Sequence, residues 1–472
     1  MIFNIKDYER DILSLIGSVG KSLGFPVFAV GGYVRDRLLN RPSKDLDIVC
    51  IGSGIELATA VASNLHPRPR LSVFKRFGTA MLKHKELEIE FVGARKESYR
   101  NDSRKPSVEE GSLQDDQNRR DFTINALAVS LNEEDFGTLI DPFDGIKHLS
   151  ERRIITPLDP AKTFSDDPLR MLRAIRFASQ LKFEIDPATF EAIKKYKSRL
   201  SIISMERIIT EVNKMVLSDP PSTGFKLLFD CGLLHEFFPE MAKLQGVEIR
   251  EGKGHKDNFY HTLEVLDNIS KNTDDLYLRW AAIMHDIAKP PTKRFEPEVG
   301  WTFHGHDGLG AALVPKIFRR LKLPLDANMK FVQKLVKLHL RPISLTKENI
   351  SDAAIRKLLF EAGDDIEALM MLCKADITSK NPNKVKRYLA NYEIVQQKMI
   401  EVEEKDHIRN WQPPISGDQI MSTFNIPPSK PVGTIKTAIK DAILDGKIPN
   451  EYEAAYSFML EKGKEIGLEK AN

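Results

Sequence analysis

The spacing of apolar residues changes at about residue 168, and this change most limits the folds open to the 472-residue chain. Before it, short apolar runs separated by turns predict strands, which cover 26–30, 45–51, 79–82, 86–92 and 127–130. After it, apolar residues recur at helical spacing, in the segments 169–180, 187–195, 205–217, 260–270, 276–288, 310–321 and 366–379. We therefore expect an α/β region with a mostly antiparallel sheet over about the first 150 residues, followed by an all-α remainder.

Composition excludes several classes of protein. Apolar residues make up 42% and charged residues 29% of the sequence, which is typical of globular domains and not of disordered or collagen-like chains. At roughly 150 residues per domain, the length predicts about three domains. Cys50, Cys231 and Cys373 lie far apart and predict buried thiols, not a zinc site or a disulfide framework. The net charge is only +3, so charge alone identifies no partner.

Membrane and export signals are missing from the sequence pattern. No apolar run reaches the ~20 residues that a membrane-spanning helix needs, and the first ten residues carry charges where a signal peptide has its apolar segment. We therefore expect a cytoplasmic protein with no membrane partner. The sequence leaves its oligomeric state open.

Two carboxylates on one predicted strand suggest a metal site. Asp45 and Asp47 are two residues apart on the strand 45–51, so both side chains project from the same face of the sheet. Carboxylate oxygens together with substrate phosphates are the ligands that Mg²⁺ prefers. Glu90, on the strand 86–92, adds a third candidate carboxylate. A D-x-D pair on its own is more often a solvated strand edge.

A glycine turn upstream makes the metal interpretation stronger. Gly31 and Gly32 follow the apolar run 26–30, and the basic Arg35 comes three residues later. Such a turn after a strand presents backbone N–H groups to an anion. The turn, the basic residue and the carboxylate pair all fall within 31–47, a combination that describes a nucleoside triphosphate held against metal ions.

A third pattern lies at the start of the helical part of the chain. A spacing of three residues separates Asp167, Arg170, Arg173 and Arg176. In a helix that begins at Pro168, this spacing places them on one side, with each position shifted slightly around the helix axis. A solvated arginine face would give the same pattern. A carboxylate can also accept from the exocyclic amine of cytosine or adenine while a guanidinium donates to a ring nitrogen or carbonyl, so this face could read a base.

Together, the segments 31–36 and 44–49 resemble the polymerase-β-like nucleotidyltransferases, specifically the class II CCA-adding enzymes and bacterial poly(A) polymerases. Segment 119–127 is similar to the second signature of this family, and 141–145 resembles its hinge between head and neck. The resemblance implies that Arg120 and Asp121 contact the triphosphate and the ribose hydroxyls, and that Gly31, Gly32 and Arg35 complete the nucleotide site.

The same resemblance gives the arginine-rich helix a role. Segment 166–170 is similar to the family motif in which an aspartate and an arginine act as a protein template for the incoming base, with Asp166 standing where the family usually has Glu. Asp167 and Arg170 are the implied template pair. Arg173 and Arg176 are expected to belong to the same nucleotide-binding face.

A second constellation resembles the HD superfamily of metal-dependent phosphohydrolases. His261, His285, Asp286 and Asp376 lie on three predicted helices with the spacing of that superfamily. Imidazoles with carboxylates suit Mg²⁺, Mn²⁺, Fe or Ni, and such a site can activate a bound water toward a phosphoester. Further candidates that could extend the site to a second metal are His304, His306, Asp307 and His339. A structural bundle with a degraded site is the alternative.

These resemblances imply a fold and a domain order. We expect a polymerase-β-like α/β nucleotidyltransferase head followed by all-α neck, HD and tail domains. The expected boundaries are 1–150 for the head, 151–250 for the base-reading and RNA-binding neck, 251–380 for the phosphohydrolase-like HD domain and 381–472 for the helical C-terminal region.

The implied activity is template-independent addition of CCA to tRNA 3′ ends. The tRNA 3′-hydroxyl would attack the α-phosphate of CTP or ATP and release pyrophosphate, with Mg²⁺ held by Asp45 and Asp47 and with Glu90 as a further catalytic carboxylate. A poly(A) polymerase, or an enzyme that adds only CC or only A, remains open. So does a protein of another class, an HD phosphohydrolase of RNA ends or nucleotides whose head only binds tRNA.

Overall fold

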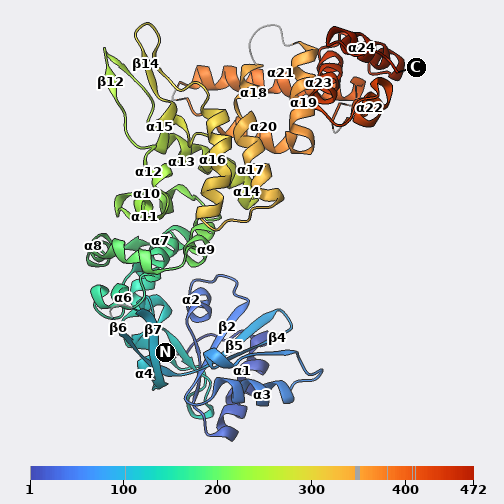
Figure 1. The fold of residues 1–472 in the computed structure, drawn as a ribbon. Coiled ribbons are helices and arrows are strands. Elements are labelled where there is room, and N and C mark those ends of the chain that lie inside the picture. The colour runs from blue at the N-terminus through green and yellow to red at the C-terminus, as the bar shows by residue number, and fades with distance from the viewer. Residues whose placement is uncertain are drawn as a thin grey trace. The chain divides into compact units, whose positions relative to one another are not determined.

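The computed structural model describes residues 2–100, 103–345, 351–379, 381–406, 408–409 and 411–471. The chain forms two compact units, Met1–Ala242 and Lys243–Asn472. The ribbon in Figure 1 shows that the first unit carries the large sheet and that the second is mainly helical. No helix among the described residues combines the length and the apolar character needed to cross a bilayer.

A seven-stranded sheet organises the first unit, with the strand order β3-β4-β5-β2-β1-β8-β9. The strands are β1 (Val27–Val30), β2 (Asp45–Cys50), β3 (Leu71–Phe74), β4 (Thr79–His84), β5 (Leu87–Gly93), β8 (Ala128–Ser130) and β9 (Leu139–Ile140). Only β2 and β5 run parallel, and the other neighbours are antiparallel. This confirms the mixed, mostly antiparallel sheet expected from the sequence.

One face of the sheet is covered by helices and the other carries carboxylates. Helices α1 (Asp7–Leu23) and α3 (Gly54–Ser63) pack against each other and against the strands, and Figure 1 shows them together along one side of the sheet. All four residues of β1 are buried. In β2, Leu46 and Ile48 are buried, so the alternation of side chains turns Asp45 and Asp47 toward the opposite face.

The rest of the first unit is helical apart from short strand pairs. Its helices are α2 (Gly32–Leu38), α4 (Leu113–Asn118), α5 (Gly145–Ser150), α6 (Pro160–Asp166), α7 (Leu169–Leu181), α8 (Pro187–Tyr196), α9 (Met205–Val216), α10 (Ser222–Asp230), α11 (Leu233–Phe237) and α12 (Pro239–Ala242). Helix α7 packs against both α9 and α10. The sequence analysis missed the hairpin of β6 (Arg95–Arg100) and β7 (Ser103–Glu110), because its charged residues lack the apolar alternation that marks a half-buried strand.

The second unit contains a helical bundle and a C-terminal group of helices. Its helices are α13 (Asn258–Ser270), α14 (Leu276–Met284), α15 (Lys289–Thr292), α16 (His306–Arg320), α17 (Ala327–Leu338), α18 (Leu340–Ser344), α19 (Asp352–Ala362), α20 (Ile366–Ala375), α21 (Pro382–Asp406), α22 (Gly417–Phe424), α23 (Lys430–Leu444) and α24 (Tyr452–Glu465). The last three share a core of buried aliphatic residues that includes Ile435, Ile439 and Met459.

The expectation of an all-α remainder needs a correction. Two hairpins interrupt the helices, β12 (Ile249–Arg250) with β13 (Lys253–Gly254), and β14 (Arg294–Glu296) with β15 (Gly300–Thr302). Gly252 and Gly300 adopt positive φ values of 71° and 98°, a conformation that glycine reaches without steric cost and that permits these tight turns. A short parallel pair, β10 (Arg153–Ile154) with β11 (Glu184–Ile185), lies in the first unit.

Two predicted helices also end earlier than expected. The helix predicted over 276–288 ends at Met284, and the helix predicted over 366–379 ends at Ala375. Asp286 and Asp376 therefore stand just beyond the C-terminal ends of α14 and α20. The carboxylates of both residues lie within 3.4 Å of His261 Nε2 on α13.

Candidate functional site

Four carboxylates meet on the open face of the sheet in the first unit. In the parallel pairing of β2 with β5, Asp45 is opposite Glu88 and Asp47 is opposite Glu90. All four line a cavity of about 290 Å³. Glu88 was not predicted, although Glu88-Ile89-Glu90 repeats the alternation of Asp45-Leu46-Asp47 and could have indicated it.

The carboxylates in this cavity repel one another. Burial raises the pKa of Asp47, and the charge of Asp45 raises it further against the opposing effect of Arg120. Burial and the charge of Asp47 likewise raise the pKa of Glu90. Within the described residues, none of the four carboxylates has a lysine or arginine nitrogen within 4.0 Å. A divalent cation would relieve this repulsion, so these hard oxygen ligands fit Mg²⁺.

The three predicted carboxylates share this cavity without forming a closed metal cage. Among the described residues, groups of three ligand atoms within 4.8 Å of one another occur only in the second unit. Asp45, Asp47 and Glu90 are thus brought to one cavity but remain spread over its wall. Such an open arrangement leaves room for phosphate oxygens to complete the coordination of a metal ion.

The glycine turn lets an arginine approach this site. Gly31 ends β1 with a φ of 73°, and a Cβ atom at this position would lie 2.8 Å from Nη1 of Arg120 and 3.4 Å from Oδ2 of Asp47. Any side chain here would therefore displace the guanidinium. The Arg120 Nε donates to buried Asp116 Oδ2 at 2.9 Å, which fixes the guanidinium beside the carboxylates.

Arg35 and Gly32 line the same cavity as the carboxylates. Arg35 is buried, and its Nη1 donates to Oδ1 of Asn125 at 2.6 Å while its Nη2 lies 2.8 Å from Oδ2 of Asp36. The structure therefore brings together the predicted residues Gly31, Gly32, Arg35, Asp45, Asp47, Glu90 and Arg120.

The residues predicted to read the base divide into two groups. Asp167 directly precedes Pro168 and α7, and its Oδ1 accepts from the backbone N–H of Leu169 at 3.1 Å. Its Oδ2 lies 3.5 Å from Nη2 of Arg207. Arg170 is buried and donates to the backbone carbonyls of Thr163 and Arg119. The carboxylate of Asp167 and the guanidinium of Arg170 thus both lie near the start of α7.

Arg173 and Arg176 are instead held by carboxylates of the protein. Arg173 Nε donates to Oδ2 of Asp121 at 2.6 Å, and Arg176 forms a buried ion pair with Glu211 on α9. Burial alone would raise the pKa of Asp121, but Arg173 and the amide of Asn125 lower it to about 2. These contacts give Asp121, Arg173 and Arg176 a clear role in fixing α7.

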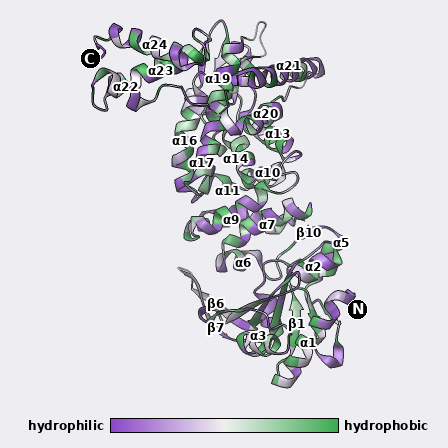
Figure 2. Cartoon of the chain, turned by 90° about the vertical axis from the view of Figure 1, so that its right-hand side faces the viewer, coloured by the Kyte–Doolittle hydropathy of each residue, from purple (hydrophilic) through white to green (hydrophobic). Residues whose placement is uncertain are grey.

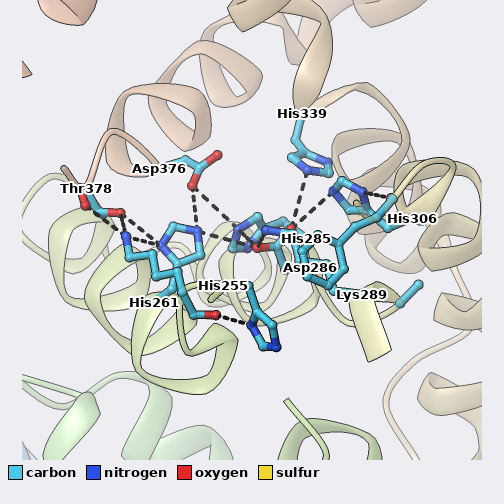
Figure 3. Close-up of polar contacts among 12 residues, drawn as sticks. His255, His261, His285, Asp286, Lys289, His306, His339, Asp376 and Thr378 are labelled. Atoms are coloured by element: carbon cyan, nitrogen blue, oxygen red, sulfur yellow. Dashed lines mark hydrogen bonds and ion pairs between the residues drawn. The ribbon is translucent and has the colours of Figure 1, made fainter. Parts of the chain in front are cut away.

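Six residues from separate segments converge in the second unit. His261 lies on α13, His306 begins α16, and the others follow the ends of helices: His285 and Asp286 after α14, His339 after α17 and Asp376 after α20. Figure 3 shows the four imidazoles turned toward the two carboxylates. Two overlapping ligand groups result, one of His261, His285 and Asp286 and the other of Asp286, His306 and His339.

Backbone contacts fix the tautomer of three of these histidines. The Nδ1 atoms of His285, His306 and His339 each lie 2.7 Å from the carbonyl oxygen three residues earlier. A carbonyl can only accept, so Nδ1 carries a proton in each ring, and the neutral form of each ring presents its Nε2 lone pair to the interior. Among the described residues, none of these buried Nε2 atoms has a hydrogen-bond partner.

These Nε2 atoms face oxygens of Asp286, and although burial opposes it, the charge of Asp286 raises the pKa of His285. The Nε2 atoms of His285, His306 and His339 lie 3.2, 3.3 and 3.9 Å from oxygens of Asp286. Burial lowers the pKa of His339 to about 4, which keeps its imidazole neutral near pH 7. Neutral imidazoles and a carboxylate held in this way fit divalent metal ions.

The structure thus brings together all four predicted HD residues and adds two of the further candidates. His306 and His339 join the cluster. His304 is exposed and lies 3.9 Å from Glu296, and Asp307 belongs to neither ligand group. The helix ends at Met284 and Ala375 explain how residues far apart in sequence reach one point.

Comparisons with known proteins match this architecture. Family models match residues 27–155 as "Poly A polymerase head domain", 182–244 as "Probable RNA and SrmB- binding site of polymerase A" and 258–380 as "HD domain". Among solved structures, the Bacillus stearothermophilus CCA-adding enzyme in complex with CTP has a TM-score of 0.66 and 24% identity over 98% of this chain and 99% of that one. A tRNA nucleotidyltransferase complexed with a primer tRNA and an incoming ATP analog has a TM-score of 0.57 and 26% identity over 81% and 99%.

Sequence relatives extend the match over most of the chain. The A-adding tRNA nucleotidyltransferase of Deinococcus radiodurans is 31% identical over 352 residues, covering 73% of this chain and 78% of the relative. The multifunctional CCA protein of Nitrosococcus oceani is 31% identical over 368 residues, covering 75% and 85%. The fold and the family expected from the sequence are both confirmed. With a polymerase-β-like head, an RNA-binding region and an HD domain in one chain, this protein belongs to the tRNA nucleotidyltransferase family.

Proposed function

We propose that the first unit adds CCA to tRNA 3′ ends from CTP and ATP without a nucleic-acid template. The observation that carries this proposal is the cavity in which Asp45, Asp47 and Glu90 face Gly32 and Arg35. The family membership supports it. These carboxylates form no ion pair with a lysine or arginine of the described residues and stand next to fixed guanidinium groups, which suits a substrate that brings both phosphates and Mg²⁺.

In this mechanism, Asp45 and Asp47 hold Mg²⁺, which when bound neutralises charge on the reacting phosphates. Arg35 and Arg120 bind the triphosphate, and Gly31 leaves the space that Arg120 occupies. Glu90 accepts the proton of the tRNA 3′-hydroxyl, because its raised pKa makes it a stronger base than an ordinary carboxylate. The hydroxyl oxygen then bonds to the α-phosphorus, and pyrophosphate leaves.

Base selection is the task proposed for Asp167 and Arg170. Asp167 keeps acceptor capacity on its carboxylate, and Arg170 is fixed by two carbonyls with further N–H groups left to donate. Asp121, Arg173 and Arg176 complete the proposed nucleotide site. Their ion pairs support a positioning role, in which they hold α7 at the correct angle to the base.

Addition of A alone is a second candidate, because the relatives include A-adding enzymes from Deinococcus radiodurans and Aquifex aeolicus. The test uses tRNA that lacks its last three nucleotides, incubated with CTP, with ATP or with both, followed by sequencing of the ends. CCA addition requires both nucleotides on this substrate. An A-adding enzyme extends only tRNA that already ends in CC, and a poly(A) polymerase produces long A tails.

For the second unit we propose a metal-dependent phosphohydrolase activity at His261, His285, Asp286, His306, His339 and Asp376. Two ligand groups that share Asp286 support this assignment. Mg²⁺, Mn²⁺, Ni²⁺ and Fe²⁺ all suit the donor set, and such an ion supplies an activated water. In the reaction, the water oxygen bonds to phosphorus, one ester P–O bond breaks, and the leaving oxygen takes up a proton.

A pure phosphohydrolase is the rival from another class, and one variant distinguishes it. Asp47→Ala would leave every activity of such a protein intact, whereas it abolishes nucleotide addition in the proposal above. tRNA, CTP and ATP are the proposed partners, and a cytoplasmic location, where these molecules are present together, belongs to the same proposal.

A further inference from the structure

A cavity of about 550 Å³ adjoins the HD residues in the second unit. His261 and Asp376 form part of its wall, and α21 forms another part. The HD family match ends at residue 380, so α21, which begins at Pro382, contributes to this cavity from outside the matched domain. The volume lies in the range of small-molecule sites, roughly 300–1,000 Å³.

The side of α21 that faces the cavity is aromatic and basic. Lys384, Tyr388 and Tyr392 recur every four residues and all line the cavity, as expected for residues on one side of a helix. Figure 2 shows α21 largely in the hydrophilic colour, and only Val395, Met399 and Val402 on it are buried. Tyr388 and Tyr392 thus offer aromatic surface to this cavity, and Tyr392 also lines a neighbouring cavity.

Positive charge accompanies the rings. Lys256 lines the cavity, and its Nζ lies 2.8 Å from the carbonyl oxygen of Thr378 and 3.1 Å from Nδ1 of His261. Figure 3 shows Thr378 beside His261 at this edge of the ligand cluster. In the described part of the chain, the Lys384 ammonium has no carboxylate within 4.0 Å. The Lys384 ammonium can therefore interact with an anion, while Lys256 adds positive charge to this edge although its Nζ also contacts Thr378 and lies 4.0 Å from Glu264.

We propose that this cavity is a nucleoside-phosphate subsite of the HD centre, an inference that rests on the phosphohydrolase activity proposed above. The base stacks on Tyr388 and Tyr392, opposite the apolar Pro342 and Ile343. The phosphate lies toward His261 and Asp376, near Lys256 and Lys384. Substrate choice at the HD centre is thus set by α21, because stacking favours a nucleotide over a phosphoester that has no base.

The test measures binding by calorimetry with the full-length chain loaded with Mn²⁺. The probes are adenosine 5′-monophosphate and ribose 5-phosphate, which differ by the base alone. Tyr388→Ala and Tyr392→Ala should each weaken binding of the nucleotide about 5- to 150-fold, the effect of about 1–3 kcal/mol per stacked base. Binding of ribose 5-phosphate should not change.

Three further variants separate stacking from damage to the fold. Tyr392→Phe keeps the ring and should bind the nucleotide like the original chain. Tyr392→Leu keeps apolar bulk but removes the aromatic face, and should weaken nucleotide binding as Tyr392→Ala does. Ile394→Ala changes an exposed apolar residue of the same helix outside the cavity wall, and should have no effect.

Equal affinity for the two probes, or equal weakening of both by the tyrosine variants, would overturn the subsite. If a tRNA ending in a 3′-phosphate competes with adenosine 5′-monophosphate, and this competition is lost in Tyr392→Ala, the natural ligand is an RNA end. If the tRNA does not compete, the natural ligand is a free nucleotide. If the Mn²⁺-loaded protein hydrolyses no p-nitrophenyl phosphate but binds nucleotide through the tyrosines, the hydrolase proposal fails and the subsite stands.

Discussion

The head and the HD region both gather acidic and metal-binding side chains, but they hold them in opposite ways. In the head, Asp45, Asp47, Glu88 and Glu90 stand on two neighbouring strands, crowded together and without cationic partners among the described residues. In the HD cluster, imidazoles from several helices surround Asp286, and backbone carbonyls fix three of them. The head site therefore carries negative charge that a bound cation would balance, whereas the HD cluster already holds its side chains in fixed positions.

This difference indicates different relations to metal. An open set of carboxylates that repel one another gains a cation most readily when the cation arrives with phosphate oxygens, so metal and nucleotide binding are coupled. A buried set of imidazoles whose Nε2 atoms surround shared carboxylates can retain an ion between reaction cycles. The comparison therefore predicts that the two sites respond differently to substitution and to metal removal.

The largest expected effect is the loss of nucleotide addition in Asp47→Ala. Removing this carboxylate takes away a ligand of the proposed Mg²⁺ and several kcal/mol of stabilisation of the transition state, so kcat/KM should fall by more than about 1,000-fold. tRNA affinity, measured by filter binding, should stay within about twofold because phosphate contacts dominate it. Glu86→Ala is the matched control, since Glu86 is exposed and pairs with Lys44. Near-normal addition by Asp47→Ala would refute the assignment.

His285→Ala should have a comparably large effect confined to the other unit. Elemental analysis after gel filtration in metal-free buffer should find bound metal in the original chain and little in the variant, and hydrolysis of 2′,3′-cyclic nucleotides should disappear. Nucleotide addition should persist, because Asp45 and Asp47 share no ligand with the cluster. His304→Ala is the control, because His304 is exposed and outside both ligand groups. Metal retained equally by original chain and variant would show that the cluster is only structural.

A smaller effect should separate Arg170 from Arg176. Arg170→Ala and Asp167→Ala remove a hydrogen-bonding partner of the base, which costs about 1–3 kcal/mol of discrimination, or about 5- to 150-fold in the preference for CTP and ATP over UTP and GTP. Arg176→Ala removes the nearer of the two arginines beside buried Glu211 and leaves Arg173 at 3.9 Å, so it should lower the melting temperature and weaken base preference less than Arg170→Ala does. Relative incorporation of the four nucleotides and thermal unfolding together check both outcomes. Unchanged selectivity in Arg170→Ala would place base reading elsewhere.

Much of this architecture could be predicted from local pattern. The strands 26–30 and 45–51 and the helix 169–180 carry regular apolar spacing, and the glycine turn with Asp45 and Asp47 is compact in sequence, so their geometry follows from short-range rules. The hairpins β12–β13 and β14–β15 were missed because their strands are two or three residues long. Such strands are too short to show a period.

The partners of charged residues were harder to predict than their positions. Arg173 and Arg176 share the spacing of Arg170, and only the packing of α7 against α9 reveals that Glu211 pairs with these two and not with Arg170. Similarly, His306 and His304 are two residues apart, yet only His306 enters the metal cluster. Tertiary contacts decide which partner such a side chain has, and the periodicity of a helix or strand carries no information about these contacts.

The smallest effect compares two carboxylates of the head whose pKa values shift in opposite directions. Asp121 has a pKa of about 2 in the folded chain, below its unfolded value of about 3.8. The ionised Asp121 carboxylate therefore adds about 2 kcal/mol to the free energy of unfolding above pH 3.8. This stabilisation is lost as the pH falls toward 2. Asp47 has a raised pKa, so its charged form opposes folding at neutral pH. Asp121→Asn should thus lower the free energy of unfolding at pH 7 and make that free energy depend less on pH below 4. Asp47→Asn should instead raise the free energy of unfolding at pH 7. Urea unfolding across this pH range measures both effects. If Asp121→Asn stabilised the chain or Asp47→Asn destabilised it, the distinction between a paired structural carboxylate and an unpaired functional one would be wrong.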